Sequence, residues 1–154
     1  MKTLIILSAI PASGKSTWAK DYASIHPDTY IVSSDEIRVE LTQQFNDHSR
    51  QKEVWELFSL RIHEYAKKEN ATVILDALND LNVLRQKYVL ENPEFDKYVL
   101  VLFKKDADRS LKLNAMRDID KQVPKEAMLA LIDKFEDVDA KTAQMFDEII
   151  NVSW

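Results

Sequence analysis

The sequence predicts an α/β fold with a parallel β-sheet and helices on both of its faces. Short stretches rich in apolar and β-branched residues alternate along the chain with longer stretches whose apolar residues recur at helical spacing. The short stretches show no clean alternation with polar residues, which is typical of strands buried on both faces, as in a parallel sheet. Strands that alternate with helices indicate βαβ units with right-handed crossovers, so we expect one sheet covered on both sides.

Each expected strand is a short apolar stretch, and the expected helices lie between the strands. The strands cover residues 3–8, 29–32, 72–75, 97–103 and 149–152. The helices cover residues 15–24, 34–44, 49–68, 82–90, 107–116 and 124–135. Pro124 stands where the last helix begins, a position that proline favours.

Length and composition indicate one globular domain over residues 1–154. The chain has 45% hydrophobic and 31% charged residues, which excludes a disordered tail or a membrane protein. No apolar run reaches the roughly 18 residues of a membrane helix. The sequence contains no cysteine, which excludes a disulfide scaffold, a thiolate zinc site and a cysteine nucleophile, and fits a cytoplasmic protein.

The net charge is −5, and the acidic excess lies near the C-terminus. Residues 125–154 carry 3 basic and 7 acidic side chains, whereas residues 1–124 carry 18 and 19. A protein that coats duplex nucleic acid non-specifically would be basic. We therefore expect no such coat. We also expect no membrane contact and no obligate protein partner. A protein that grips one end of a strand stays compatible with this charge.

Residues 9–17, Ala-Ile-Pro-Ala-Ser-Gly-Lys-Ser-Thr, follow the first expected strand and open the first expected helix. Gly14, Lys15 and Ser16 match the end of the phosphate-loop pattern G-x-x-x-x-G-K-[ST], whereas Ala9 replaces its first glycine. Gly14 is the only glycine in the chain and stands where the pattern requires one. The alternative is a chance turn that caps a helix. The motif predicts that ATP, or another nucleoside triphosphate, is bound with Mg²⁺ by Pro11, Ala12, Ser13, Gly14, Lys15, Ser16 and Thr17.

Individual residues of this loop have specific expected properties. Lys15 is expected to reach the β- and γ-phosphates, and the Ser16 hydroxyl is expected to bind Mg²⁺. Gly14 is expected to have a positive φ. Ala9 and Ala12 are expected to keep a negative φ, because a residue with a side chain is strained in the left-handed region.

Asp35 and Arg38 follow the second expected strand and share one face of a helix start, since they lie three residues apart. The ligand crevice of a parallel sheet lies at the carboxyl ends of its strands, which places Asp35 at the same edge as the phosphate loop. A carboxylate there can accept the proton of an attacking hydroxyl. The arginine can hold a phosphate or stabilise a transferring phosphoryl group. The alternative is an ordinary helix start with an acidic first turn and an ion pair.

Two further segments carry candidate site residues. The third expected strand ends in Asp76, the position of a Walker B carboxylate that holds the metal ion directly or through water, although a simple strand-end turn would look the same. Asn79 is a candidate for lining the acceptor site. Residues 104–123 are dense in charge, and we expect them to form a lid in which Arg117 closes over the phosphates. A solvated helix face is the alternative for this segment.

The remaining histidines and tryptophans are not expected to act in the site. No metal-ligand spacing relates the histidines, which we expect to be structural or exposed: His26, His48 and His63. The tryptophans are interpreted as packing residues rather than a base-stacking platform: Trp18, Trp55 and Trp154.

In this order, the motifs resemble the kinase domain of phage-type polynucleotide 5′-kinases, a branch of the P-loop kinases that includes kinase modules of RNA-repair enzymes. The resemblance covers residues 1 to about 135. It rests on P-A-S-G-K-S-T-W, on D-x-x-R beginning at Asp35, on Asp76 with the nearby Asn79, and on N-x-x-R ending at Arg117. Ser34 precedes Asp35 where some relatives carry arginine. The chain has no room for the phosphatase domain of some relatives, so no 3′-end activity is expected.

The resemblance implies the strand order 2-3-1-4-5 and a role for each matching residue. Lys15 and Ser16 would bind donor phosphates and metal, Asp35 would be the general base, Arg38 the phosphate-clamping arginine and Arg117 the lid arginine. The implied reaction transfers the γ-phosphate of ATP to a 5′-hydroxyl end of DNA or RNA.

Two other functions stay open. One is a P-loop kinase of a small molecule, such as a nucleoside monophosphate or a sugar nucleotide in a toxin-like reaction. The other is a nucleotide-binding module without transfer chemistry. Asp35 and Arg38 argue against the binding module, because a pure binder needs neither residue.

Overall fold

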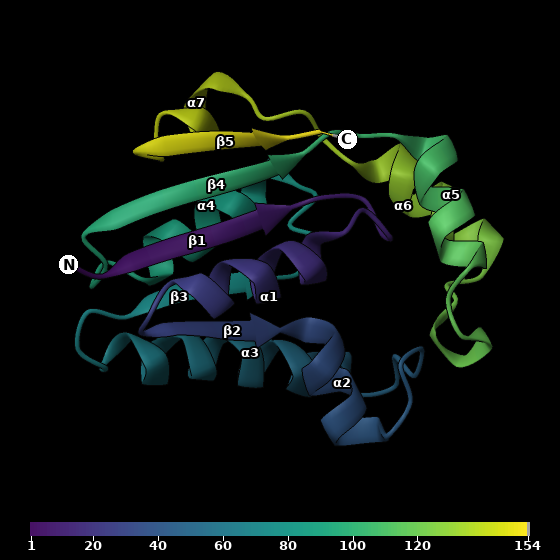
Figure 1. Cartoon of the computed structure of the whole chain (residues 1–154), viewed down its shortest axis with the longest axis horizontal. Coiled ribbons are helices and arrows are strands. Elements are labelled where there is room, and N and C mark those ends of the chain that lie inside the picture. The colour runs from purple at the N-terminus through teal and green to yellow at the C-terminus, as the bar shows by residue number, and fades with distance from the viewer. Residues whose placement is uncertain (154) are drawn as a thin grey trace.

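The computed structural model describes residues 1–153 and contains one five-stranded parallel sheet (Figure 1). Its strand order, β2-β3-β1-β4-β5, confirms the predicted fold class and order. The strands are β1 (Thr3–Ser8), β2 (Thr29–Ser33), β3 (Thr72–Asp76), β4 (Lys97–Phe103) and β5 (Glu148–Val152).

The predicted helices are present as α1 (Lys15–Ile25), α2 (Ser34–Thr42), α3 (Gln51–Ala66), α4 (Asn82–Glu91), α5 (Ala107–Ala115) and α6 (Lys125–Lys134). The 3₁₀ helix η1 (Ile119–Lys121) and the short helix α7 (Ala140–Ala143) are not predicted by the sequence pattern, because neither is long enough to show helical periodicity. Helix α2 ends earlier than expected because Gln43 adopts the left-handed conformation, with φ of 65°. None of the helices within residues 1–153 is long and apolar enough to cross a membrane.

The two faces of the sheet are covered by different helices. Leu4 of β1 packs in the cluster that contains Phe58 of α3 and Tyr88 of α4, whereas Ile5 packs in the cluster that contains Ala19 of α1. Figure 1 shows α1 in front of the sheet and α3 and α4 behind it. Because successive residues of β1 enter opposite apolar clusters, the strand has no polar side, as the sequence pattern indicated.

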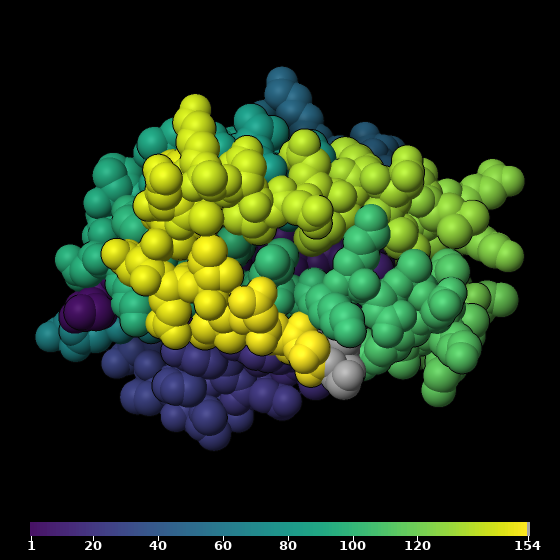
Figure 2. Space-filling view, turned by 90° about the horizontal axis from the view of Figure 1, so that it is seen from above, coloured from purple at the N-terminus to yellow at the C-terminus, as the bar shows by residue number. Residues whose placement is uncertain are grey.

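The carboxyl ends of all strands meet at one edge of the sheet. The phosphate loop leaves β1 at this edge, and α2 leaves β2 there (Figure 1). Beyond the edge lie the lid (residues 104–123) and α6, which extend past the yellow strand β5 in Figure 2. Ile10 and Ala12 of the phosphate loop pack with Met128 and Ile132 of α6, so an apolar contact joins the loop to this outer unit.

Candidate active site

The backbone of the phosphate loop confirms part of its predicted conformation. Gly14 has a φ of 86°, and Ala9 is outside the left-handed region, as expected. The prediction for Ala12 is wrong, since its φ is 58°. Ala12 is only 3% exposed and packs against Met128 and Ile132. Burial of its methyl group in this cluster partly offsets the roughly 1–2 kcal/mol that the left-handed conformation costs a residue with a side chain.

The start of the loop is braced by the segment that follows β3. The N–H of Ala9, which replaces the usual glycine, donates to the Leu78 carbonyl at 2.9 Å. Asn79 Nδ2 donates to the Leu7 carbonyl at 2.7 Å, and the Ser8 hydroxyl donates to the Asn79 carbonyl at 2.7 Å. Asn79 lines the cavity described below, and its amide nitrogen is engaged in holding the loop.

The side chains of Lys15 and Ser16, at the start of α1, face Asp76 at the end of β3. Ser16 Oγ donates to Asp76 Oδ2 at 2.8 Å, and Lys15 Nζ lies 3.9 Å from Asp76 Oδ1. Within the described part of the chain, Asp76 Oδ1 and Ser13 Oγ are buried without a hydrogen-bond partner. Buried polar atoms in this state need an explanation, and a bound ligand or ion beside them is one.

The oxygen atoms of Ser16 and Asp76 fit a magnesium ion. A hydroxyl and a carboxylate are ligands that Mg²⁺ accepts. Residues 1–153 contain no group of three or more His, Asp or Glu side chains that could hold a metal ion alone. Mg²⁺ usually keeps several waters and takes further ligands from substrate phosphates, so two protein oxygens are a sufficient contribution. Ser16 and Asp76 are therefore suited to hold the ion together with a nucleotide.

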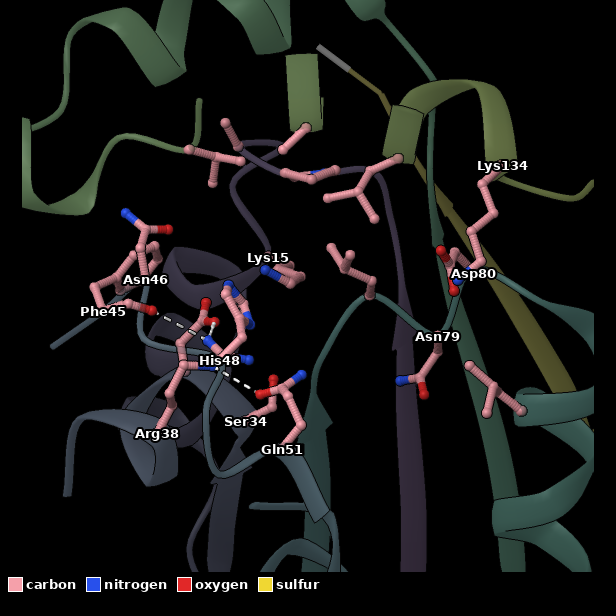
Figure 3. A pocket seen from close by; sticks show the side chains of 18 of the residues that line it. Lys15, Ser34, Arg38, Phe45, Asn46, His48, Gln51, Asn79, Asp80 and Lys134 are labelled. Atoms are coloured by element: carbon pink, nitrogen blue, oxygen red, sulfur yellow. Dashed lines mark hydrogen bonds and ion pairs between the residues drawn. The ribbon is translucent and has the colours of Figure 1, made fainter. Parts of the chain in front are cut away.

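Arg38 connects Asp35 to the loop that precedes α3. Its Nη1 donates to Asp35 Oδ1 at 2.7 Å and to the Phe45 carbonyl at 3.4 Å, and its Nε donates to Gln51 Oε1 at 3.1 Å (Figure 3). The side chain of Arg38 is 7% exposed and that of Asp35 is 37% exposed. Asp35 is thus accessible to a substrate, while Arg38 is built into the wall of the site.

One cavity of about 650 Å³ brings all four predicted catalytic residues together. Its lining includes Pro11, Ala12, Lys15, Asp35, Arg38 and Arg117. The lining carries five cationic side chains but only two carboxylates, although the whole chain has a net charge of −5. The lining is therefore more positive than the chain as a whole, although Lys15, Arg38 and Lys87 each lie within 4.0 Å of a carboxylate. Such an excess suits a ligand that carries phosphate. The remaining predicted loop and metal residues lie outside this lining: Ser13, Gly14, Ser16, Thr17 and Asp76.

The lid reaches the cavity through Arg117, which follows the end of α5. Asn114 Nδ2 donates to the Val123 carbonyl at 2.8 Å, and Asn114 Oδ1 accepts the Val123 N–H at 2.9 Å. Gln122 Nε2 donates to the Arg117 carbonyl at 2.9 Å. From the α2–α3 loop, Asn46 Nδ2 donates to the Gln122 carbonyl at 2.9 Å. The turn that carries Arg117 is therefore closed on itself and joined to the opposite side of the site.

Comparison with known families now identifies the chain's relatives. The family described as chromatin associated protein KTI12 matches residues 2–144. The chain belongs to the KTI12 family. Kti12 of Chaetomium thermophilum, solved in complex with ADP-AlF3, is similar with a TM-score of 0.71 and 17% identity, and the match covers 98% of this chain and 89% of that chain.

Two other solved structures extend the likeness to P-loop kinases. A chain of the Pnkp1/Rnl/Hen1 RNA repair complex is similar with a TM-score of 0.76 and 21% identity, over 95% of this chain but 46% of that chain. A gluconokinase from Sinorhizobium meliloti 1021 is similar with a TM-score of 0.66 and 13% identity, over 97% of this chain and 81% of that chain. At these identities the likeness shows the fold. The predicted resemblance is thus confirmed at the level of the P-loop kinase fold. Membership of the phage-type polynucleotide kinases is not shown, and the family that matches is KTI12.

Arg85 of α4, which no sequence motif marked, is fully buried in this KTI12-family chain. Its Nε donates to Ser8 Oγ at 3.1 Å and to the Asn79 carbonyl at 2.9 Å, and its Nη2 donates to the Glu136 carbonyl at 2.8 Å. Burial lowers the pKa of Arg85, and neighbouring carboxylates oppose that shift. Arg85 lies one helical turn before the buried Tyr88, so a charge on the apolar face of the helix is the signal that could have revealed it.

An aromatic wall of the cavity is the second feature that the sequence analysis does not identify. Phe45 and His48 of the α2–α3 loop and Trp55 of α3 line the cavity, and we call these three residues the ring wall. Trp55 is a packing residue, as predicted, since its ring meets Phe58 edge-on with centroids 5.2 Å apart. It also lines the cavity, so packing is only part of its role. His48 is exposed, as expected, but it is exposed at the cavity.

The other histidines and tryptophans match their structural interpretation where they are described. Trp18 stacks on Tyr22 with centroids 5.2 Å apart, and His26 stacks on the same tyrosine at 3.8 Å. His63 Nδ1 lies 3.0 Å from a carboxylate oxygen of Glu94. Trp154 lies outside the described residues.

Proposed function

We propose that this KTI12-family chain transfers the γ-phosphate of ATP to a hydroxyl group, and that this hydroxyl is the 5′ end of a DNA or RNA strand. The observation that carries the proposal is the position of Asp35. Its carboxylate, held by Arg38 at 2.7 Å, shares one cavity with Lys15 and Arg117. A protein that only binds a nucleotide needs no accessible carboxylate in the cavity of its phosphate loop. The arrangement supports phosphoryl transfer.

Each site residue has a defined part in the proposed step. The Asp35 carboxylate takes the proton of the acceptor hydroxyl as the hydroxyl oxygen forms a bond to the γ-phosphorus. The bond between that phosphorus and the β–γ bridging oxygen breaks, and ADP leaves. Lys15 and Arg117 stabilise the negative charge on the phosphoryl oxygens. Mg²⁺, held by Ser16 and Asp76, would neutralise further phosphate charge.

Two observations support a nucleic acid end as the acceptor. The cavity concentrates positive charge in an acidic chain, which suits an acceptor that carries phosphate. One similar structure belongs to an RNA repair complex, which makes an RNA end a reasonable acceptor to test first. Because the cavity is local, we expect only the first one or two nucleotides to contact the protein.

A compact small molecule is the second candidate acceptor. The cavity volume of about 650 Å³ lies within the range of small-molecule sites, roughly 300–1,000 Å³. The hydrogen bond of 2.9 Å from Asn46 to the Gln122 carbonyl joins the α2–α3 loop to the lid and favours a small acceptor.

The test is transfer of labelled γ-phosphate from ATP to a panel of acceptors, with Mg²⁺ and with chelator. The panel contains 5′-hydroxyl DNA and RNA oligonucleotides of increasing length, nucleosides, nucleoside monophosphates and sugar acids. We expect label at oligonucleotide 5′ ends, with rates nearly independent of length beyond a few nucleotides and only mildly sensitive to salt. Asp35→Asn should abolish most transfer, whereas Glu36→Gln on the adjacent exposed position should not.

Other outcomes of the panel would change the conclusion. Transfer to small molecules alone would favour the second candidate. Rates that keep rising steeply with length would reveal an extended nucleic-acid groove. ATP hydrolysis that no acceptor and no Asp35 substitution affects would contradict a phosphotransferase.

A further inference from the structure

We propose that the ring wall receives the nucleobase of the acceptor's terminal nucleotide, so that the protein grips a strand end by one stacked base. This inference rests on the proposed function and specifies which part of the acceptor the cavity recognises. The ring wall comes from one short stretch of chain, residues 45–55, that follows α2. Figure 3 shows two of its members, Phe45 and His48, beside Arg38 and on one side of Lys15.

A single guanidinium fixes the ring wall relative to Asp35. Arg38 Nη1 bonds to Asp35 Oδ1 at 2.7 Å and to the backbone carbonyl of Phe45 at 3.4 Å. Arg38 Nε bonds to Gln51 at 3.1 Å, and Gln51 lies one helical turn before Trp55. The Asp35 carboxylate, the backbone at Phe45 and the first turn of α3 are therefore joined through one side chain. A nucleobase stacked on the rings would position its 5′-hydroxyl with respect to Asp35.

The chemistry of the ring wall fits a nucleobase better than a sugar acid. Aromatic rings offer flat faces on which any nucleobase can stack, with little dependence on sequence. A carboxylate-bearing acceptor would need a free cation at this wall, whereas the Arg38 guanidinium there is already bonded to Asp35, Gln51 and the Phe45 carbonyl. Lys134 lies on the other side of Lys15 in Figure 3, away from Phe45 and His48.

The join between the ring wall and the lid limits how much of a strand fits. Asn46, next to Phe45, donates from Nδ2 to the carbonyls of Gln122 at 2.9 Å and Asp120 at 3.3 Å. These bonds tie the α2–α3 loop to the lid beside the cavity. With about 650 Å³ available, the ring wall contacts the terminal nucleobase alone.

The experiment compares two oligonucleotides that differ only at the 5′-terminal residue. One carries a nucleobase there, and the other carries a tetrahydrofuran abasic residue that keeps the 5′-hydroxyl. For the unmodified protein, removal of the nucleobase should lower kcat/KM about 5- to 150-fold, the range expected for loss of one base–aromatic stack. In Phe45→Ala and His48→Ala, kcat/KM should fall for the base-bearing strand but little for the abasic strand. The ratio of kcat/KM for the base-bearing strand to kcat/KM for the abasic strand, called the base ratio, should therefore move toward one.

Control substitutions show whether the base dependence belongs to the ring wall. Leu60→Ala, on the exposed side of α3, should leave the ratio unchanged. Leu131→Ala tests the α6 wall of the same cavity. Melting temperatures of all variants show whether the fold is kept, and Phe45 and His48 are substituted before Trp55 because Trp55 packs on Phe58.

Three results would overturn the inference. The first is a base ratio near one in the unmodified protein. The second is a base ratio that Phe45→Ala and His48→Ala leave unchanged. The third is a base ratio that changes only in Leu131→Ala, which would place the nucleobase on α6. If neither strand is phosphorylated, the proposed function fails. Equilibrium binding of the same two strands, with a non-hydrolysable ATP analogue present, then tests separately whether the ring wall holds a nucleobase. Base-dependent binding that is lost in Phe45→Ala supports the inference. Equal binding of the two strands by the unmodified protein contradicts it.

Discussion

The donor side and the acceptor side of the candidate active site are built in different ways. The donor side is the continuous loop of residues 9–17 closed by Asp76, and its shape is set by backbone conformation at Ala12 and Gly14. The acceptor side is assembled from separate segments by side-chain hydrogen bonds, above all those of Arg38 and Asn46. This difference teaches that acceptor-side substitutions should change turnover while leaving ATP affinity nearly intact. Donor-side substitutions should change both.

Lys15→Ala should have the largest effect of the substitutions, because it removes the donor-side ammonium. We expect transfer to be abolished and ATP binding to weaken, since the ammonium holds the β- and γ-phosphates in both the ground state and the transition state. Labelled transfer and ATP titration measure the two effects. Lys20→Ala, an exposed lysine of the same helix, is the control. Full activity of Lys15→Ala would refute the phosphate-loop assignment.

Asp35→Asn should separate the two sides. The substitution keeps the size of the side chain and removes the proton acceptor, so turnover should fall about 10²–10⁴-fold, the usual range for a lost general base. ATP affinity should stay near normal. If ATP affinity falls as much as turnover, Asp35 belongs to the donor side as a metal or structural residue.

Arg117→Ala tests the lid, which touches both sides. Turnover should fall about 10³-fold, the lower end of the range for an arginine supplied to a transferring phosphoryl group. The melting temperature should hardly change, because Arg117 lies in a turn closed by Asn114, Gln122 and Val123. Lys121→Ala, an exposed lid residue, should leave turnover close to normal. A large loss of stability in Arg117→Ala would show a structural role instead.

Ala12→Gly should give the smallest effect and tests how the donor-side backbone is held. Glycine relieves the left-handed strain at φ of 58°, worth about 1–2 kcal/mol. It also loses a buried methyl group and gains freedom in the unfolded state, which together cost a similar amount. The free energy of unfolding should therefore change by less than about 1 kcal/mol. Denaturant unfolding measures it, and a loss of several kcal/mol would show that methyl packing dominates.

The donor side could be read from the sequence because its residues are contiguous and its glycine is unique. The strand order and strand ends followed from apolar stretches and from the family resemblance. The left-handed Ala12 could not be foreseen, because the packing that tolerates it comes from α6, more than a hundred residues along the chain. The ring wall could not be predicted from the sequence for a similar reason. A tryptophan that packs on Phe58 and a loop histidine have no spacing that marks them as parts of one cavity.

Arg85 has a mechanical consequence for how the molecule would open. The same guanidinium fastens the end of β1, through Ser8, and the chain just after α6, through the Glu136 carbonyl. The outer unit, formed by the lid and α6, is therefore anchored to the sheet at the end of α6 that leads into Glu136. Any movement of the outer unit relative to the sheet should be smallest at Glu136 and larger toward Ile119, which is 87% exposed. Because α6 also packs against Ile10 and Ala12, such a movement would loosen the packing that holds Ala12 in the left-handed conformation.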